Sequence, residues 1–131
     1  MQPRQDPHPI NVCRNRSGSD IAKHRIVMRD VDQGVDAYQA AGDAAAPLMG
    51  VTLEAIANGK NGNLAQGGLA IVEAGAAISV GAKVTAGTGG KGAASSADED
   101  HIIGIANTEA TLDGDLIEVQ MTAIGTQNAS A

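Results

Sequence analysis

Short apolar runs separated by turn residues are the feature that most constrains the fold of this chain. From residue 60 onward, runs of four to six residues lie between dipeptides such as Asn-Gly, Gly-Gly and Asp-Gly. The runs are too short for ordinary helices, and the alternation over 116–121 is typical of a strand with one buried face. Strands spaced about every ten residues predict a mainly β fold, either a small barrel or a sandwich.

The same reasoning assigns the individual elements. Residues 48–56 fit either a helix or a strand, because their apolar spacing is helical while Gly50, Val51 and Thr52 favour a strand. Asn61-Gly62 is expected to be a turn, and residues 87–96 are expected to be a loop. The expected strands are 24–29, 69–73, 82–85, 102–106 and 116–121, with shorter extended pieces at 35–40 and 77–80.

Large side chains for a core are scarce. The 131 residues include no Phe, no Trp and a single Tyr, while 17 are Gly and much of the hydrophobic 43% is Ala. Because apolar burial contributes roughly 25 cal/mol per Å², small side chains stabilise a fold weakly. A single copy is therefore expected to be marginally stable, and self-association or docking on a partner would compensate. One Tyr also cannot provide an aromatic platform for stacking nucleic-acid bases.

Charge is distributed unevenly along the chain. Residues 1–30 hold six basic and three acidic residues, a net charge of +3, and residues 31–131 hold three basic and twelve acidic ones, a net charge of −9. The acidic body should be repelled by nucleic acid, so no nucleic-acid partner is expected. The basic region 1–30 could contact an acidic protein surface, or its charged side chains could simply be solvated on a loose terminus. The candidate contact residues are Arg14, Arg16, Lys23, Arg25 and Arg29.

The chain divides into three expected parts. Residues 1–20 are predicted to be an extended, flexible arm, because three prolines precede residue 10 and the run 14–19 is polar. Residues 21–126 form the β domain, and residues 127–131 a frayed tail. We expect neither a secretory signal nor a membrane partner, since no apolar h-region or run of roughly 20 apolar residues occurs. The single Cys13 excludes a disulfide framework within one chain.

A weak internal sequence repeat is present in the β region. Gly50-Val51 is followed by the run 61–64, Asn-Gly-Asn-Leu, and Gly104-Ile105 is followed by the run 113–116, Asp-Gly-Asp-Leu. This pattern predicts two similar strand–turn–strand units that pack against each other about the central Ala-Gly-rich segment.

Two motifs could suggest a ligand, but each has a simpler interpretation. Residues 87–92 match G-x-G-x-x-G, yet the residues after the motif have no apolar face for the helix that a dinucleotide site needs. The acidic run 98–101 and the Asp-Gly-Asp at 113–115 contain metal-capable groups without the spacing of a zinc or calcium site. We expect no cofactor and no metal.

Catalytic residues are equally hard to assemble. A pair formed by Cys13 and His24 remains open, although nothing in the sequence fixes its geometry. Carboxylate pairs, Glu54 with Glu118 or Asp113 with Asp115, can be proposed on paper for a hydrolase. No enzyme is expected.

The β region nevertheless resembles a known family. The runs 47–51 (PLMGV), 68–85 (GLAIVEAGAAISVGAKVT), 101–106 (HIIGIA) and 113–119 (DGDLIEV) resemble, in order and spacing, the capsid decoration or cement proteins of tailed bacteriophages. The resemblance covers about residues 47–121, and residues 1–46 do not match it.

The resemblance implies a non-enzymatic, β-barrel-like or β-tulip-like module. Such a protein would bind the outer face of a capsid as a homotrimer, clamp neighbouring major capsid subunits, and lay its N-terminal arm across the shell. It would be made in the host cytoplasm and reside on the virion exterior. The alternative is a β-clip-like module for a small ligand or a sugar, which the centre of the sequence also loosely resembles; such a module needs a concave pocket with convergent polar groups.

Overall fold

The computed structural model describes residues 3–7, 10–29, 37–40, 48–95 and 101–126, excluding the side chains of Asn11, Arg29, 37–40 and 122–126. The fold is mainly β, as predicted, and the described residues contain no α-helix. The strands are β1 (Asp6–Pro7), β2 (Ile10–Asn15), β3 (Ile26–Arg29), β4 (Ala37–Ala40), β5 (Leu48–Thr52), β6 (Asn61–Ala65), β7 (Gly68–Glu73), β8 (Lys83–Ala86), β9 (Gly92–Ala94), β10 (His101–Ala106) and β11 (Leu116–Thr126), with a 3-10 turn, η1, at Thr88–Gly90.

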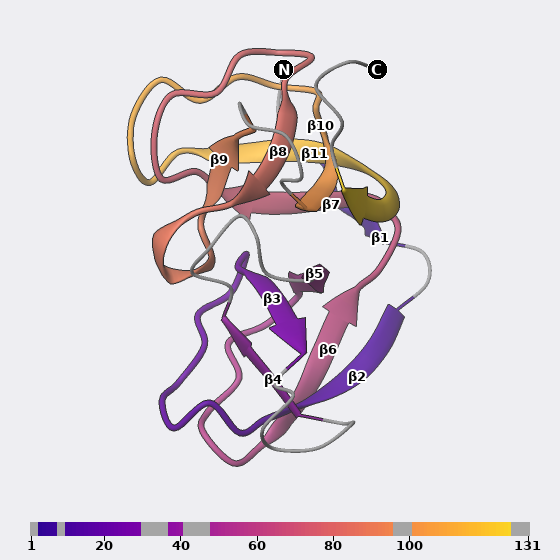
Figure 1. Ribbon diagram of the computed structural model, residues 1–131, viewed down its shortest axis with the longest axis vertical. Coiled ribbons are helices and arrows are strands. Elements are labelled where there is room, and N and C mark those ends of the chain that lie inside the picture. Colours follow the sequence, from indigo (N-terminus) through magenta and orange to yellow (C-terminus); the bar gives the residue numbers. More distant parts are fainter. Residues whose placement is uncertain (1–2, 8–9, 30–36, 41–47, 96–100, 127–131) are drawn as a thin grey trace.

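Two β units are stacked end to end (Figure 1). The first unit, β2 to β6, is a closed barrel in the order β2-β4-β3-β5-β6. The second unit, β7 to β11, belongs to an open antiparallel sheet in the order β1-β7-β11-β10-β8-β9. The first strand of the chain, β1, therefore pairs with the second unit, and the next strand, β2, belongs to the first.

The two units repeat the same topology. Read from β2, the barrel has the strand order β2-β6-β5-β3-β4, and the open sheet read from β7 has the order β7-β11-β10-β8-β9. Each strand of the first unit thus has a counterpart five strands later, with matching neighbours. The predicted pair of similar units is confirmed, and it extends to five strands each.

Hydrogen bonds outside the ladders repeat as well. The Gly59 N–H donates to the Asn15 carbonyl at 2.7 Å, and the Gly114 N–H donates to the Ala74 carbonyl at 2.8 Å. Both glycines have positive φ, +80° and +96°, a backbone conformation that other residues adopt only with strain. The bridge between Ile21 and Ile56 likewise corresponds to the bridge between residues 78 and 110.

The predicted alignment of the two repeated units was wrong. Asn61-Gly62 is not a turn but the start of β6, so its counterpart is the start of β11 at Leu116-Ile117. The turn that corresponds to Asp113-Gly114 is Asn58-Gly59. The expected alignment was shifted by three residues because it matched Asn61-Gly62, which lies in a strand of the first unit, with Asp113-Gly114, which is a turn in the second.

The units differ in how they close. In the barrel, β4 pairs in parallel with β2 over Arg14 and Asn15. In the open sheet, the counterpart strands β7 and β9 form no ladder with each other, and a single parallel bridge joins Ala74, just after β7, to Gly92 at the start of β9. Part of the free edge of β7 is used by other segments: β1 pairs beside its first two residues, and the Glu73 N–H donates to the His24 carbonyl at 3.1 Å. The first unit and the N-terminal strand thus occupy the edge that would otherwise complete a second barrel.

The core is aliphatic and runs through both units. Successive residues of β3 face opposite interiors: Ile26 packs with the second unit, and Val27 packs inside the barrel with Cys13 and Leu64. Because β3 is buried on both faces, it joins the two units into one packed body. The larger cluster includes the small residues Ala65, Ala70, Ala74, Ala86, Ala106 and Ala110, which allow the strands to approach closely.

Several local predictions need correction. Of the two alternatives for residues 48–56, the strand is confirmed for 48–52, which form β5. The extended piece expected at 77–80 forms no strand beyond the bridge at Ile78. The expected loop 87–96 contains η1 and β9. The prediction of an irregular arm over residues 1–20 is wrong for 6–7 and 10–15, which are β1 and β2. The tail at 127–131 lies outside the described residues.

Candidate interaction surface

The predicted contact residues do not form one cluster. Arg14 is the last residue of β2 that points outward, and Arg16 follows the end of the strand; both are exposed. Lys23 is exposed on the turn before β3. Arg29 ends β3, and its side chain lies outside the described part. Arg14, Arg16 and Lys23 are therefore the predicted residues that the structure presents to solvent.

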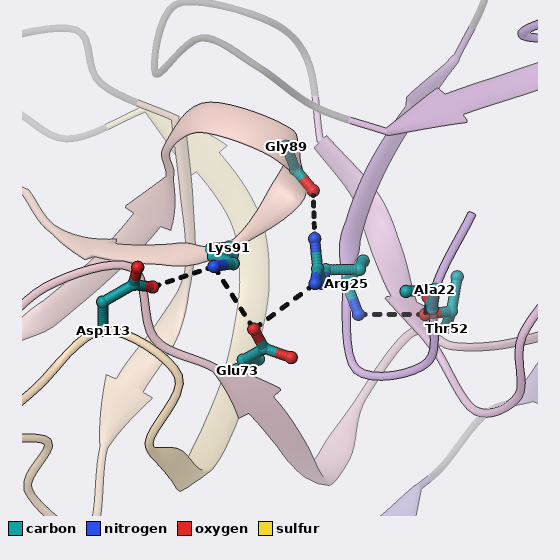
Figure 2. A network of polar contacts seen from close by, with 7 residues as sticks. All are labelled: Ala22, Arg25, Thr52, Glu73, Gly89, Lys91 and Asp113. Carbon is teal, nitrogen blue, oxygen red and sulfur yellow. Dashed lines mark hydrogen bonds and ion pairs between the residues drawn. The ribbon is translucent and has the colours of Figure 1, made fainter. Parts of the chain in front are cut away.

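Arg25 has partners within the chain (Figure 2). Its guanidinium lies 3.3 Å from the Glu73 carboxylate, donates to the Gly89 carbonyl at 3.0 Å, and is 20% exposed. Its backbone N–H donates to the Thr52 hydroxyl at 2.9 Å. Since Glu73 and Gly89 belong to the second unit, Arg25 links the two units, a role that sequence reasoning missed.

Lys91 completes this polar network (Figure 2). Its ammonium group lies 2.8 Å from Asp113 and 3.4 Å from Glu73. The hydrogen bond from Lys91 to Asp113 raises the pKa of Lys91 above its ordinary value. The network borders a hollow of about 450 Å³ whose lining is otherwise made mainly of glycine and alanine. Its cations are already balanced by carboxylates, so the hollow has little charge left to hold an anion.

The G-x-G-x-x-G segment belongs to a β edge. Gly87 leads into η1, and β9 follows from Gly92, so the described residues after the motif form a strand. A Cβ at Gly92 would lie 2.9 Å from a methyl of Val72. Close packing of β9 on β7 thus accounts for this glycine without a bound phosphate.

Cys13 and His24 do not form an activated pair. Cys13 is buried in the barrel core, and burial raises the pKa of its thiol to about 11. Burial also lowers the pKa of His24. A protonated thiol enclosed by Ile21, Val27 and Leu64 lacks the exposed thiolate that nucleophilic catalysis needs.

The proposed carboxylate pairs are engaged elsewhere. Glu54 accepts the Asn63 N–H in the first unit, whereas Glu118 lies on β11 of the second. Asp115 accepts the N–H groups of residues 111 and 112, which lowers its pKa. Asp113 pairs with Lys91.

Within the described residues, no group of three His, Cys, Asp or Glu side chains could hold a metal ion. No helix in that part of the chain is long and apolar enough to cross a membrane.

Glu118 fastens the N-terminal segment to the second unit. Its buried carboxylate accepts from the Arg4 backbone N–H at 3.0 Å, from the Arg4 guanidinium at 3.1 Å and from the Asn107 amide at 2.8 Å. Because β7 lies between β1 and β11, the chain from Arg4 to β1 crosses the outside of β7. The bond from Arg4 is the main cause that lowers the pKa of Glu118 below its ordinary 4.5.

Replacing Arg4 by alanine should therefore destabilise the fold in a pH-dependent way. Since the folded-state pKa of Glu118 is depressed, its contribution is fully present above pH 4.5 and is lost as pH falls through the folded-state value. The thermal midpoint of Arg4→Ala should lie below that of the wild type at pH 7, and the gap should shrink as the pH falls below 4.5. In a Glu118→Gln background the same substitution should give no such pH dependence. If the gap in thermal midpoint still shrinks with falling pH there, Arg4 acts through other contacts.

The fold and surface define a class of protein. The chain is a double β unit with an aliphatic core, and it exposes Arg14 and Arg16 at one end of β2. A model of the phage cement protein family matches residues 8–121. The chain belongs to the phage cement protein family, which gives it a capsid-associated structural role in the virion. The family match also covers residues 8–46, where the sequence resemblance stopped.

A solved structure shares the fold. The crystal structure of the head fiber gp8.5 N base in bacteriophage phi29 superposes with a TM-score of 0.70, covering 91% of this chain and 98% of that chain, at 18% sequence identity. At this identity the match supports the fold. No curated protein matches the chain.

Proposed function

We propose that the protein is a non-enzymatic decoration protein that binds the outer surface of a phage capsid and stabilises contacts between major capsid subunits. The family match over residues 8–121 carries the proposal. The exposed cations Arg14, Arg16 and Lys23 provide the first contact candidates. The protein would be made in the host cytoplasm and added to the exterior of the shell.

A homotrimer fits this role. Three linked copies would engage three equivalent sites, and the effective concentration of the second and third contacts would be high once the first had formed. Weak individual contacts can then hold a shell firmly. Self-association would also supplement a core built largely from alanine, valine and isoleucine.

The direct test uses mature empty capsids of the phage that encodes this chain. Purified protein should bind them saturably, raise the temperature at which the shells come apart, and sediment as a trimer by analytical ultracentrifugation. The absence of both saturable binding and a gain in shell stability would contradict the proposal. A monomer that binds would contradict only the trimer.

The β-clip-like alternative would place its ligand in the hollow beside Arg25 and Lys91. The charged groups beside this hollow already pair with each other, which supports the structural role instead. A thermal shift with a metabolite or sugar, in a protein that ignores capsids, would favour the alternative.

A further inference from the structure

The outer face of β2 carries two of the large aliphatic side chains that the described residues expose to solvent. Ile10 is 54% exposed and Val12 is 60% exposed, although both lie on a strand of the closed barrel. Cys13 is buried within the same strand, so the outward residues are Ile10, Val12 and Arg14. Neighbouring exposed aliphatic side chains on a regular strand, beside a cation, are typical of a surface that another chain covers.

The neighbouring strand extends this face with uncharged polar groups. In the ladder Val12 lies opposite Asn63, and Arg14 lies opposite Asn61; both asparagines are exposed. A hollow of about 260 Å³ is lined by Val12, Cys13, Arg14 and Asn61. We name these five outward residues, Ile10, Val12, Arg14, Asn61 and Asn63, the β2 face.

Basic residues surround one end of the β2 face. Arg16 is exposed just beyond Arg14, and exposed Lys60 precedes Asn61 on the neighbouring strand. The Asn15 N–H donates to the Lys60 carbonyl at 2.9 Å, which holds the two chain segments side by side. Glu54 accepts the Asn63 N–H opposite Val12, so an acidic group lies near the middle of the face. A carboxylate on a partner would therefore favour the Arg14 end.

The internal repeat shows how an equivalent face is covered. In register, Ile10, Val12 and Arg14 correspond to Leu69, Ile71 and Glu73 of β7. These three counterparts are only partly exposed.

The cover over the counterpart face comes from the same chain. Residues 4–7 cross it: β1 pairs beside Leu69, and Arg4 reaches Glu118, which lies opposite Ile71. An extended segment thus runs beside Leu69 and reaches the residue opposite Ile71, where its cation pairs with a carboxylate of the face. Arg25 and Lys91 neutralise the remaining carboxylate, Glu73.

The β2 face has the same apolar pattern with the opposite charge. Where the β7 face offers Glu73 and Glu118, the β2 face offers Arg14 and Asn63. We propose that the β2 face docks an extended segment of the capsid subunit that carries aliphatic and acidic side chains. This inference rests on the proposed function and adds to it the surface, the two apolar anchors and the chemistry of the partner.

The test compares binding of three proteins to mature empty capsids of the encoding phage. The first is the wild type, and the second is the triple variant Ile10→Thr, Val12→Thr, Arg14→Glu. Threonine keeps the strand preference of both positions while removing most of the apolar surface, and the charge reversal repels a carboxylate. The third is the control Val80→Thr, Leu112→Ser, which alters two aliphatic side chains that are also exposed but belong to the second unit.

The wild type and the control should bind alike, and the triple variant should bind at least about 100-fold more weakly, given the apolar area and charge pairing lost. Unchanged thermal unfolding of the free triple variant shows that the loss is not one of folding. Equal binding by the triple variant would overturn the inference and leave the proposed function intact. A triple variant that dissociates into monomers while its single copies keep their affinity for capsids would overturn it too, by making the β2 face a contact between copies. Absence of wild-type binding would contradict both proposals.

Discussion

Gly104→Ala should strongly destabilise the fold, although it adds a single methyl group. A Cβ at Gly104 would overlap the carbonyl oxygen of Gln120 on β11 and stand 2.8 Å from a methyl of Val119. The obstacle is backbone in a paired strand, which cannot rotate away as a side chain can. We expect a loss of about 3 kcal/mol in the free energy of unfolding. Chemical denaturation followed by circular dichroism measures it.

Gly87→Ala is the matched control. There a Cβ would lie 3.4 Å from the Ala93 side chain, an ordinary contact, so stability should hardly change. The internal repeat adds a second case, because a Cβ at Gly50 would stand 2.5 Å from the Ala65 carbonyl oxygen, the counterpart of the obstacle at Gly104. Gly50→Ala should therefore also destabilise. A Gly104→Ala protein as stable as the wild type would contradict the close approach of β10 and β11.

Ile26→Ala should have a comparable effect for a different reason. Ile26 is fully buried and packs a strand of the barrel against the core of the second unit. Truncation removes apolar contacts and leaves a cavity between the units, so we expect a loss of about 3 kcal/mol. The measurement is again the free energy of unfolding from denaturant titration.

Ile10→Ala separates burial from residue type. It makes the same chemical change on another strand of the barrel, at a side chain that is more than half exposed. Its stability should stay within about 0.5 kcal/mol of the wild type, while its affinity for capsids should fall. Equal losses of stability at both positions would mean that Ile26 does not join the two units.

The β class was predictable because it depends on local pattern. The strands β7, β10 and β11 were predicted from their apolar runs, and each is buried on at least one face. The strands that were missed lack that signal. Strand β9 is Gly-Ala-Ala, and β6 begins with Asn-Gly, which indicates a turn in most contexts.

Strand β2 was missed because its outward positions are also apolar. Ile10 and Val12 face solvent while Cys13 faces the core, so the expected alternation of apolar and polar residues is blurred. The nearby prolines and arginines then favoured an irregular arm. The blurred pattern was itself the signal of a surface that another chain could cover.

The candidate site depends on contacts that no local pattern contains. Arg25 and Glu73 are 48 residues apart, and Arg4 and Glu118 are 114 apart. Which cations are engaged within the chain and which face solvent follows from the stacking of the two units. Sequence could give the basic composition of the N-terminal region, but not the separation of Arg25 from Arg14.

A density map of whole phage particles tests the central claim most directly. The double β unit should appear on the outer surface of the shell, at positions where neighbouring capsid subunits meet, with β2 turned toward a capsid subunit. Particles that lack this density, or that hold the protein inside the shell, would contradict the decoration role.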